Sequence, residues 1–579
     1  MNSSLSAVIC VLNSKYIHSS LAPWCLLAGV DAYCEKDITA QVIEGTINEP
    51  IENVAQRILA QNAQVIGFCC YIWNITATLQ LVRLVKAQQP NAVIILGGPE
   101  VSYHAEDVLR EEPLVEYIIA GEGEEPFANL LSAIQKGEEP QNISGACYRR
   151  GEQLVISPPC TPAKEPPSPY TRAYFDELKG RIAYLETSRG CPYSCAFCLS
   201  GRCGNARFFD LERAKKELLL LANSGTQTVK LVDRTFNANR KRAVELFRFI
   251  IENYGEAIPK GVCFHFELAG DLLDDETINL LATAPLGAMQ LEIGLQSFNP
   301  KTLAAINRKT DVERLKNNIS RLAANANMHI HIDLIAGLPY EDFASFAQSF
   351  NTAYALKPNM LQLGFLKLLY GAPMREHPED YPCEYAKQPP YEVTSTPWLS
   401  VQELLNLHCI EDALERLSNS GRFPRTLEYL FKQGEQSAFD LFYQFGLFCT
   451  QKGTENIPLD AYNALVYVYF CEQNGIDKTV LRDMMVCDRL ATNSSGKLPN
   501  VLRVKDPALK SAVHLLEQSE ETRSQKGVKR GVALLYSENC AVYADYREKN
   551  PITGEYPLFK MKDNELFHKT LSCGTSLHE

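Results

Sequence analysis

The first 140 residues alternate short apolar runs with amphipathic segments. Continuous apolar runs occupy residues 7–12, 65–71, 92–96 and 117–120, and a weaker run at 40–44 predicts an edge strand. Between them, residues 51–61 and 76–87 carry the spacing of amphipathic helices. Strands that are apolar on both faces and alternate with helices are typical of a parallel, doubly wound α/β sheet. In such a sheet, ligands bind beyond the carboxyl ends of the strands.

Polar or glycine-rich loops follow these strands. They carry Asn13, Tyr16, Ile17, His18 and Ser19 after the first, Tyr71 and Trp73 after the 65–71 run, Gly97, Gly98, Pro99 and Glu100 after the 92–96 run, and Gly121 and Glu122 after the last. Paired glycines after a strand allow a flat ligand to approach the backbone closely. A domain that binds a nucleotide, or no ligand, is the alternative. Neither G-x-G-x-x-G nor a Walker A sequence follows the first strand, so dinucleotide and ATP binding lack support.

A proline-rich segment at residues 158–170 marks a domain boundary, and a second α/β pattern follows it. Strands are predicted at 181–187, 228–232, 261–268, 288–294 and 329–335, with helices at 210–224, 241–253, 274–284 and 312–325. Polar residues stand at the strand ends, where βα barrels hold their chemistry.

From about residue 385 the pattern becomes mainly helical. Helices are predicted from residue 401, after a Ser400-x-x-Glu403 capping box, and at 438–449 and 461–473. Strand-like runs at 531–535 and 541–546 and a turn at 550–554 come last.

Composition narrows the class of protein. The 579 residues are 46% hydrophobic and 22% charged, with a net charge of −12, which predicts a globular enzyme and disfavours nucleic acid or an anionic membrane as partner. The 19 cysteines are scattered and odd in number, and neither a signal peptide nor an apolar run of membrane-spanning length is evident. We therefore expect a reducing cytoplasm and no membrane partner.

Cys191, Cys195 and Cys198 form a C-x3-C-x2-C motif. Three thiolates on one loop can hold three irons of a 4Fe-4S cluster and leave the fourth iron open. Half of a zinc site is one alternative, although zinc sites usually pair C-x2-C with a second ligand pair. A cluster closed by Cys203, serving only electron transfer, is another.

This motif resembles the signature of the radical SAM superfamily, in which the open iron binds S-adenosylmethionine (SAM). Together with the N-terminal loops, it resembles the cobalamin-dependent radical SAM family, in the branch with an uncharacterised C-terminal domain. The resemblance implies a Rossmann-like cobalamin-binding domain at 1–140, a linker at 141–180, a partial (β/α)6 barrel at 181–384 and a mainly helical domain at 385–579. The cofactors implied are a 4Fe-4S cluster, SAM and cobalamin.

The resemblance also assigns SAM contacts. Phe197 stands where the family has an aromatic near the adenine, and Asp233, Arg234 and Thr235 where a loop receives the SAM amino group. Glu267 and Gln296 resemble the residues that touch the ribose and carboxylate. Asp333 and the segment Gln296-Ser297…Asn307-Arg308 match further family motifs, although Asp333 could anchor a turn and Arg308 could cap a helix. Arg189 is expected to neutralise cluster or SAM charge.

The N-terminal loop residues named above are implied to bind cobalamin. The D-x-H-x-x-G motif, whose histidine coordinates cobalt in the methionine-synthase type of domain, is absent. The resemblance therefore implies cobalamin with its dimethylbenzimidazole tail off the cobalt and no histidine in its place. For His18, capping of the next helix is the favoured interpretation and cobalt binding the alternative.

The implied function is methylation of an unactivated carbon, with an electron donor such as flavodoxin or ferredoxin and a substrate that the sequence does not identify. Two alternatives stay open. One is non-methylating radical chemistry such as cyclisation, rearrangement or oxidation. The other is a non-catalytic iron-sulfur binding or sensory protein. A methylthiotransferase is disfavoured because its second cluster domain and RNA-binding barrel are not evident.

Overall fold

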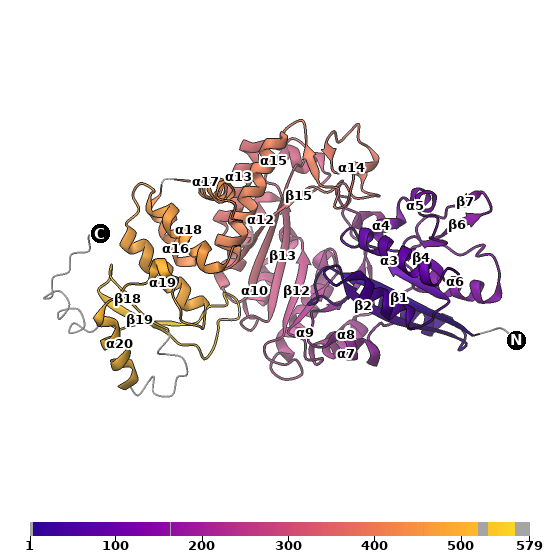
Figure 1. The fold of residues 1–579 in the computed structure, drawn as a ribbon, viewed down its shortest axis with the longest axis horizontal. Helices are drawn as coiled ribbons and strands as arrows, with labels where there is room; N and C mark the ends of the chain where they lie inside the picture. Colours follow the sequence, from indigo (N-terminus) through magenta and orange to yellow (C-terminus); the bar gives the residue numbers. More distant parts are fainter. Residues whose placement is uncertain (1–3, 163, 435, 455–456, 519–530, 562–579) are drawn as a thin grey trace.

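The computed structural model describes the chain except residues 1–3, 163, 435, 455–456, 519–530 and 562–579. Figure 1 shows three parts in a row. The N-terminal sheet and the C-terminal helices lie on opposite sides of the central strands, so the C-terminal part is remote from most of the N-terminal part.

The N-terminal part is a seven-stranded sheet of order β2-β1-β3-β4-β5-β6-β7. β1 (Leu5–Asn13), β2 (Ile38–Thr46), β3 (Val65–Cys69), β4 (Val93–Gly97) and β5 (Tyr117–Ile119) are parallel, and β2 is at the predicted edge. The antiparallel strands β6 (Ala146–Arg150) and β7 (Gln153–Val155) continue the sheet. Both strands lie within residues 141–180, where the sequence predicts a linker. These strands have five and three residues and lie at the edge of the sheet.

Helices cover both faces of this sheet. α1 (Ala22–Tyr33) and α6 (Glu124–Lys136) pack on one face, in the apolar cluster that includes Ile9. α2 (Ile51–Leu59), α3 (Ile75–Gln88) and α5 (Ala105–Glu111) pack on the other, in the cluster that includes Val8. Adjacent residues of β1 thus face opposite cores, as expected for a strand buried on both sides. The doubly wound prediction is confirmed.

The central part is a six-stranded parallel sheet of order β8-β11-β12-β13-β14-β15. The strands are β8 (Ala183–Leu185), β11 (Thr228–Leu231), β12 (Cys263–Leu268), β13 (Met289–Gln296), β14 (His329–Ala336) and β15 (Met360–Phe365). α8 (Leu211–Ala222), α9 (Arg240–Asn253), α10 (Asp275–Ala282), α12 (Val312–Asn325) and α13 (Phe343–Ala355) follow strands in turn. β8 and β15 do not pair with each other, so the barrel is partial, as predicted. Before β8, α7 (Arg172–Leu178) interrupts the predicted linker.

The C-terminal part holds α15 (Val401–Ala413), with its predicted capping box, α16 (Pro424–Gln433), α17 (Ala438–Gln451), α18 (Leu459–Cys471), α19 (Lys478–Thr492) and α20 (Pro507–Gln518). The predicted strands are β18 (Val532–Leu535) and β19 (Cys540–Ala544), and β20 (Leu558–Met561) joins them. Phe350 of the barrel packs against Phe439 and Phe442 of α17. The C-terminal helices therefore share a core with the barrel. Among the described residues, no helix combines the length and apolar character needed to cross a membrane.

Candidate functional site

The cysteine loop follows β8 and is fixed from several sides. Ala196 donates its N–H to the carbonyl of Ile306 (2.9 Å) and accepts from the N–H of Met374 (3.0 Å). Gly190 has φ +88°, and a β-carbon at this position would lie 3.0 Å from the carbonyl oxygens of Gly204 and Asn205. The loop therefore requires glycine here, because an L side chain would be strained at this φ and also crowded.

The cysteines differ in burial and in neighbours. Cys195 is buried, whereas Cys191 and Cys198 are partly exposed. The Arg308 guanidinium is 3.8 Å from the Cys195 sulfur and donates to the carbonyl of Gly294, and Thr235 Oγ1 is 3.4 Å from the Cys191 sulfur. Arg308 therefore contacts the cysteine loop and does not merely cap a helix. Burial raises the pKa of Cys195, and Arg308 opposes that rise.

The spread of the three sulfurs bears on which metal they could hold. Among the described residues, two groups of three potential ligands have their ligand atoms within 4.8 Å of one another. One is Glu292, His331 and Asp333, and the other is exposed; the three cysteines do not form such a group. Sulfurs around a single zinc ion lie closer, since each Zn–S bond is about 2.3 Å. The loop therefore fits a multi-iron cluster better than one zinc ion. The Cys203 side chain is outside the described part.

Asp233 has a different environment from the one predicted. Its carboxylate accepts hydrogen bonds from the Thr187 N–H (2.9 Å), the Thr187 hydroxyl (2.7 Å) and the Ser188 hydroxyl (2.5 Å). Burial raises the pKa of Asp233 to about 6, although these donors oppose the shift. Asp233 thus secures the segment leading into the cysteine loop. The next residue, Arg234, lines a large cavity.

The other residues predicted to contact SAM are near the strand ends. Glu267 lies on the third barrel strand, 3.4 Å from the Lys230 ammonium, and Asp333 on the fifth, 2.9 Å from His331. Gln296 ends the fourth strand with φ +74°. Phe197 is partly buried and packs against the barrel core. SAM contact by these residues stays a prediction.

A cavity of about 580 Å³ lies between the N-terminal sheet and the barrel. Its wall includes most of the loop residues predicted to bind cobalamin: Asn13, His18, Ser19, Tyr71, Trp73, Gly97, Gly98, Pro99, Gly121 and Glu122. From the barrel, Tyr184, Glu186, Arg189 and Arg234 complete it. Tyr16 and Ile17 are 68% and 48% exposed and do not line it.

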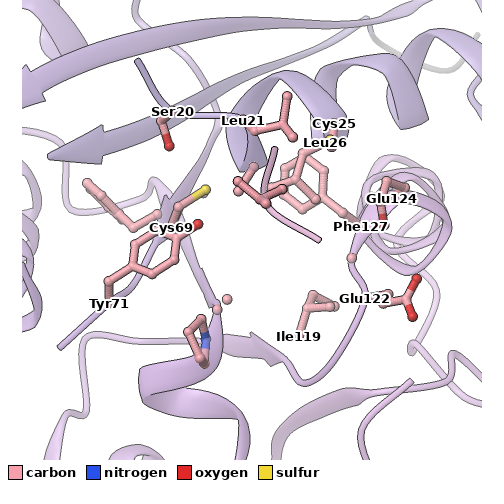
Figure 2. Close-up of a pocket in the computed structure, with 18 of the residues that line it drawn as sticks. Ser20, Leu21, Cys25, Leu26, Cys69, Tyr71, Ile119, Glu122, Glu124 and Phe127 are labelled. Carbon is pink, nitrogen blue, oxygen red and sulfur yellow. The ribbon is translucent and has the colours of Figure 1, made fainter. Parts of the chain in front are cut away.

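The lining of this cavity suits cobalamin. Figure 2 shows Cys25, Leu26, Ile119 and Phe127 around its inner part, between the sheet and helices α1 and α6. That part is apolar and could accept the dimethylbenzimidazole tail. Trp73, 47% exposed, stacks on Tyr71 with ring centroids 4.4 Å apart, so aromatic surface is available to a flat macrocycle. The residues therefore fit the cofactor.

Two predicted cobalamin residues make other contacts. His18 Nδ1 is 2.7 Å from the Tyr184 hydroxyl, and α1 has no side-chain cap at Leu21. The interpretation of His18 as a helix cap is wrong, because its side chain reaches the barrel instead. Glu100 is 5% exposed, accepts a 2.5 Å hydrogen bond from Tyr391 and is absent from the cavity wall.

Arg189 joins the two domains. Its guanidinium contacts Glu122 (2.6 Å) and Glu124 (2.5 Å) of the N-terminal part and Glu186 (2.9 Å) of the barrel. Arg207 also pairs with Glu122. Three carboxylates therefore already pair with Arg189, and its expected role in neutralising cluster or SAM charge stays a prediction.

Sequence reasoning missed several residues around the cavity and inside the barrel: Tyr184, Glu186, Lys230, His265, Glu292 and His331. A signal for some was present. Polar residues alternate with apolar ones in β12, β13 and β14, as in His329-Ile330-His331-Ile332-Asp333. Barrel strands whose inner face is packed would be apolar on both sides.

Comparisons with known proteins agree with this division of the chain. Family models match residues 10–131 (B12 binding domain), 185–353 (Radical SAM superfamily) and 379–533 (a protein of unknown function, DUF4080). The cobalamin-dependent radical SAM methyltransferase TokK of Streptomyces tokunonensis is 29% identical over 317 residues, 51% of this chain and 45% of the relative. A 2-(S-pantetheinyl)-carbapenam-3-carboxylate methyltransferase of Streptantibioticus cattleyicolor is 29% identical over 297 residues, 49% and 43%. The chain thus spans less than half the length of these relatives.

Solved structures establish the fold. The cobalamin-dependent SAM radical enzyme OxsB, with aqua-cobalamin bound, superposes with a TM-score of 0.60 at 15% identity, covering 84% of this chain and 79% of that one. The radical SAM methyltransferase TsrM from Kitasatospora setae superposes with a TM-score of 0.53 at 17% identity, covering 64% and 74%.

Proposed function

We propose that this chain, a member of the cobalamin-dependent radical SAM family, transfers a methyl group to an unactivated carbon of its substrate. The observation that carries the proposal is that a cavity suited to cobalamin opens onto the barrel beside the cysteine loop, with Arg189 fixing the two domains together. When bound, the cluster supplies the electron that cleaves SAM to a 5′-deoxyadenosyl radical, and cobalamin supplies the methyl group.

The chain's own residues have separate tasks in this proposal. Cys191, Cys195 and Cys198 bind the cluster, and Arg308 positions the Cys195 thiolate. Asp233 positions the cysteine loop through Thr187 and does not contact SAM. The SAM contacts we propose are the remaining predicted residues, Phe197, Arg234, Thr235, Glu267, Gln296 and Asp333. The predicted cobalamin residues that line the cavity hold that cofactor, whereas Glu100, Tyr16 and Ile17 do not contact it.

We further propose that the domain roles follow the predicted order, with the first domain extended to about residue 155. The electron donor is a small redox protein such as flavodoxin or ferredoxin. The compartment is a reducing cytoplasm, supported by the 17 described cysteines, none of which forms a disulfide.

The first test is iron and cobalt content after anaerobic purification from cells supplied with cobalamin. We expect near four irons and one cobalt per chain. Reduced protein given SAM with a deuterated methyl group should then release 5′-deoxyadenosine and transfer the label to the substrate. Cys198→Ala should lose iron and SAM cleavage, and Cys449→Ala, a buried cysteine of α17, should keep both. SAM cleavage with no label in any product would favour non-methylating radical chemistry.

A further inference from the structure

The interior of the partial barrel is lined by polar side chains. In β12, β13 and β14, one set of alternate residues, including Phe266, Leu291 and Ile332, is buried in the apolar core. The other set therefore faces the lumen, because successive strand residues point to opposite sides. A barrel that serves only as a scaffold fills these positions with branched apolar residues.

The strand register arranges the lumen residues in three layers. Tyr184, Lys230, His265, Gln290 and His329 form the first, Glu267, Glu292 and His331 the second, and Gly294, Asp333 and Gln362 the third. Tyr184 also lines the cavity proposed for cobalamin. Its hydroxyl lies 2.7 Å from Nδ1 of His18, which lines the same cavity. The lumen and the cavity are therefore neighbouring spaces.

Glu292 is the centre of the charged groups in the lumen. Its Oε2 lies 3.1 Å from the Lys230 ammonium, 2.8 Å from His265 Nε2 and 4.0 Å from His331 Nδ1. Burial alone would raise the pKa of Glu292, but His265, Lys230 and His331 lower it to about 2. Glu292 is therefore ionised at neutral pH, at a depth where an ion is costly unless it is paired.

The network is not complete within the protein. His265 and His331 are 9% and 6% exposed, and Nε2 of each makes no hydrogen bond within the described chain, although a carboxylate oxygen lies nearby at an unfavourable angle. Burial lowers the pKa of His265, so its ring is neutral, and one of its nitrogens can accept a hydrogen bond. Glu267 and Glu292 share the single ammonium of Lys230, and Asp333 lies 2.9 Å from His331 Nε2.

From these observations we propose that the methyl acceptor is a hydrophilic molecule or side chain carrying a protonated amine, which Glu292 and His265 bind in the lumen. This inference rests on the function proposed above. The groups here are mostly acceptors, which match the three N–H donors of an ammonium group. An anionic or purely apolar acceptor would meet carboxylates without gaining a partner for them.

A metal ion is the main competing occupant. Ligand atoms of Glu292, His331 and Asp333 lie within 4.8 Å of one another. Lys230, however, already contacts Glu292 and would repel a divalent cation at this position.

Four-carbon probes test the proposal without turnover. Putrescine, succinate, erythritol and 1-butanol have similar size and differ in charge and polarity. Their binding to the full chain, loaded with oxidised cluster, hydroxocobalamin and SAM, is measured by saturation-transfer NMR in 150 mM NaCl. We expect putrescine to bind best, and Glu292→Gln to weaken it at least about tenfold. Glu313→Gln, at a side chain that is 83% exposed, should leave binding unchanged.

A second variant, Lys230→Met, tests whether misfolding could explain weaker putrescine binding by Glu292→Gln. Removing the ammonium that competes for Glu292 should tighten putrescine binding by about tenfold or more, which a disrupted lumen cannot do. Equal or better binding of succinate or 1-butanol, no putrescine binding, or indifference to both substitutions would overturn the proposal. So would one zinc ion per chain that is lost in His331→Gln. None of these outcomes alters the iron and cobalt content or the methyl-transfer result that test the proposed function.

Discussion

Replacement of Arg189 by methionine should loosen the junction between the N-terminal domain and the barrel. The Arg189 side chain is 13% exposed and contacts Glu122, Glu124 and Glu186, which are 14%, 8% and 19% exposed. Removing one partner of a buried ion pair costs about 3–5 kcal/mol, because the remaining charge is left without compensation. We expect Arg189→Met to lower the free energy of unfolding by this amount at pH 8.

The loss should shrink as the pH falls. Burial tends to raise the pKa of Glu124, but Arg189 outweighs it and holds the pKa below its ordinary value. In the native protein this contribution is present above the unfolded pKa and is lost as the pH falls through the folded pKa. Without Arg189, burial would raise the pKa of these carboxyl groups, so the variant would take up protons on folding. The difference from wild type at pH 5 should therefore be below about 2 kcal/mol.

Urea unfolding followed by tryptophan fluorescence measures this effect. Two of the three tryptophans, Trp24 and Trp73, belong to the N-terminal domain, so they report on the domain that loses its contact. Arg110→Met is the control, because Arg110 is 61% exposed and its pair with Glu106 is worth less than about 1 kcal/mol. A loss below about 1 kcal/mol for Arg189→Met, or one that does not change with pH, would refute the argument.

Three further predictions concern other contacts of the barrel. Burial raises the pKa of Glu341 to about 7, so the carboxyl group is protonated in the folded protein below pH 4.5 and loses this proton, and the stability that goes with it, as the pH rises through 7. Glu341→Gln should therefore raise the free energy of unfolding by on the order of 3 kcal/mol at pH 8 and by less than about 1 kcal/mol at pH 5, measured by urea unfolding. Tyr391→Phe should lower the free energy of unfolding by about 1–3 kcal/mol in the same assay, because buried Glu100 loses its hydrogen-bond donor; an unchanged value would contradict this. Gly371→Ala should lower stability by about 2 kcal/mol more than Gly137→Ala, because both glycines have positive φ but only at Gly371 would a β-carbon meet an aromatic ring, at 2.3 Å; equal losses would show that backbone strain alone decides.

The sequence alone was enough for most of the buried parallel strands, the cysteine loop and the domain order. Apolar runs such as residues 65–71 and 92–96 predict buried parallel strands because a strand covered on both faces needs apolar residues at every position. The C-x3-C-x2-C spacing is local, so Cys191, Cys195 and Cys198 could be recognised without knowing what surrounds them. The strands β6 and β7 were not predicted because five and three residues are too few for a strand pattern to stand out in the sequence.

Only the tertiary structure decided how the polar residues are shared between binding and support. Asp233, Arg189 and Glu100 have the residue types of ligand contacts, yet each makes a hydrogen bond or ion pair with a residue at least 45 positions distant in sequence. The direction in which a long polar side chain turns depends on which charges the other domain brings near it. The polar lumen likewise emerged from the register of strands β11 to β14, because Lys230 and Glu292 meet only when the strand between them places both on one face.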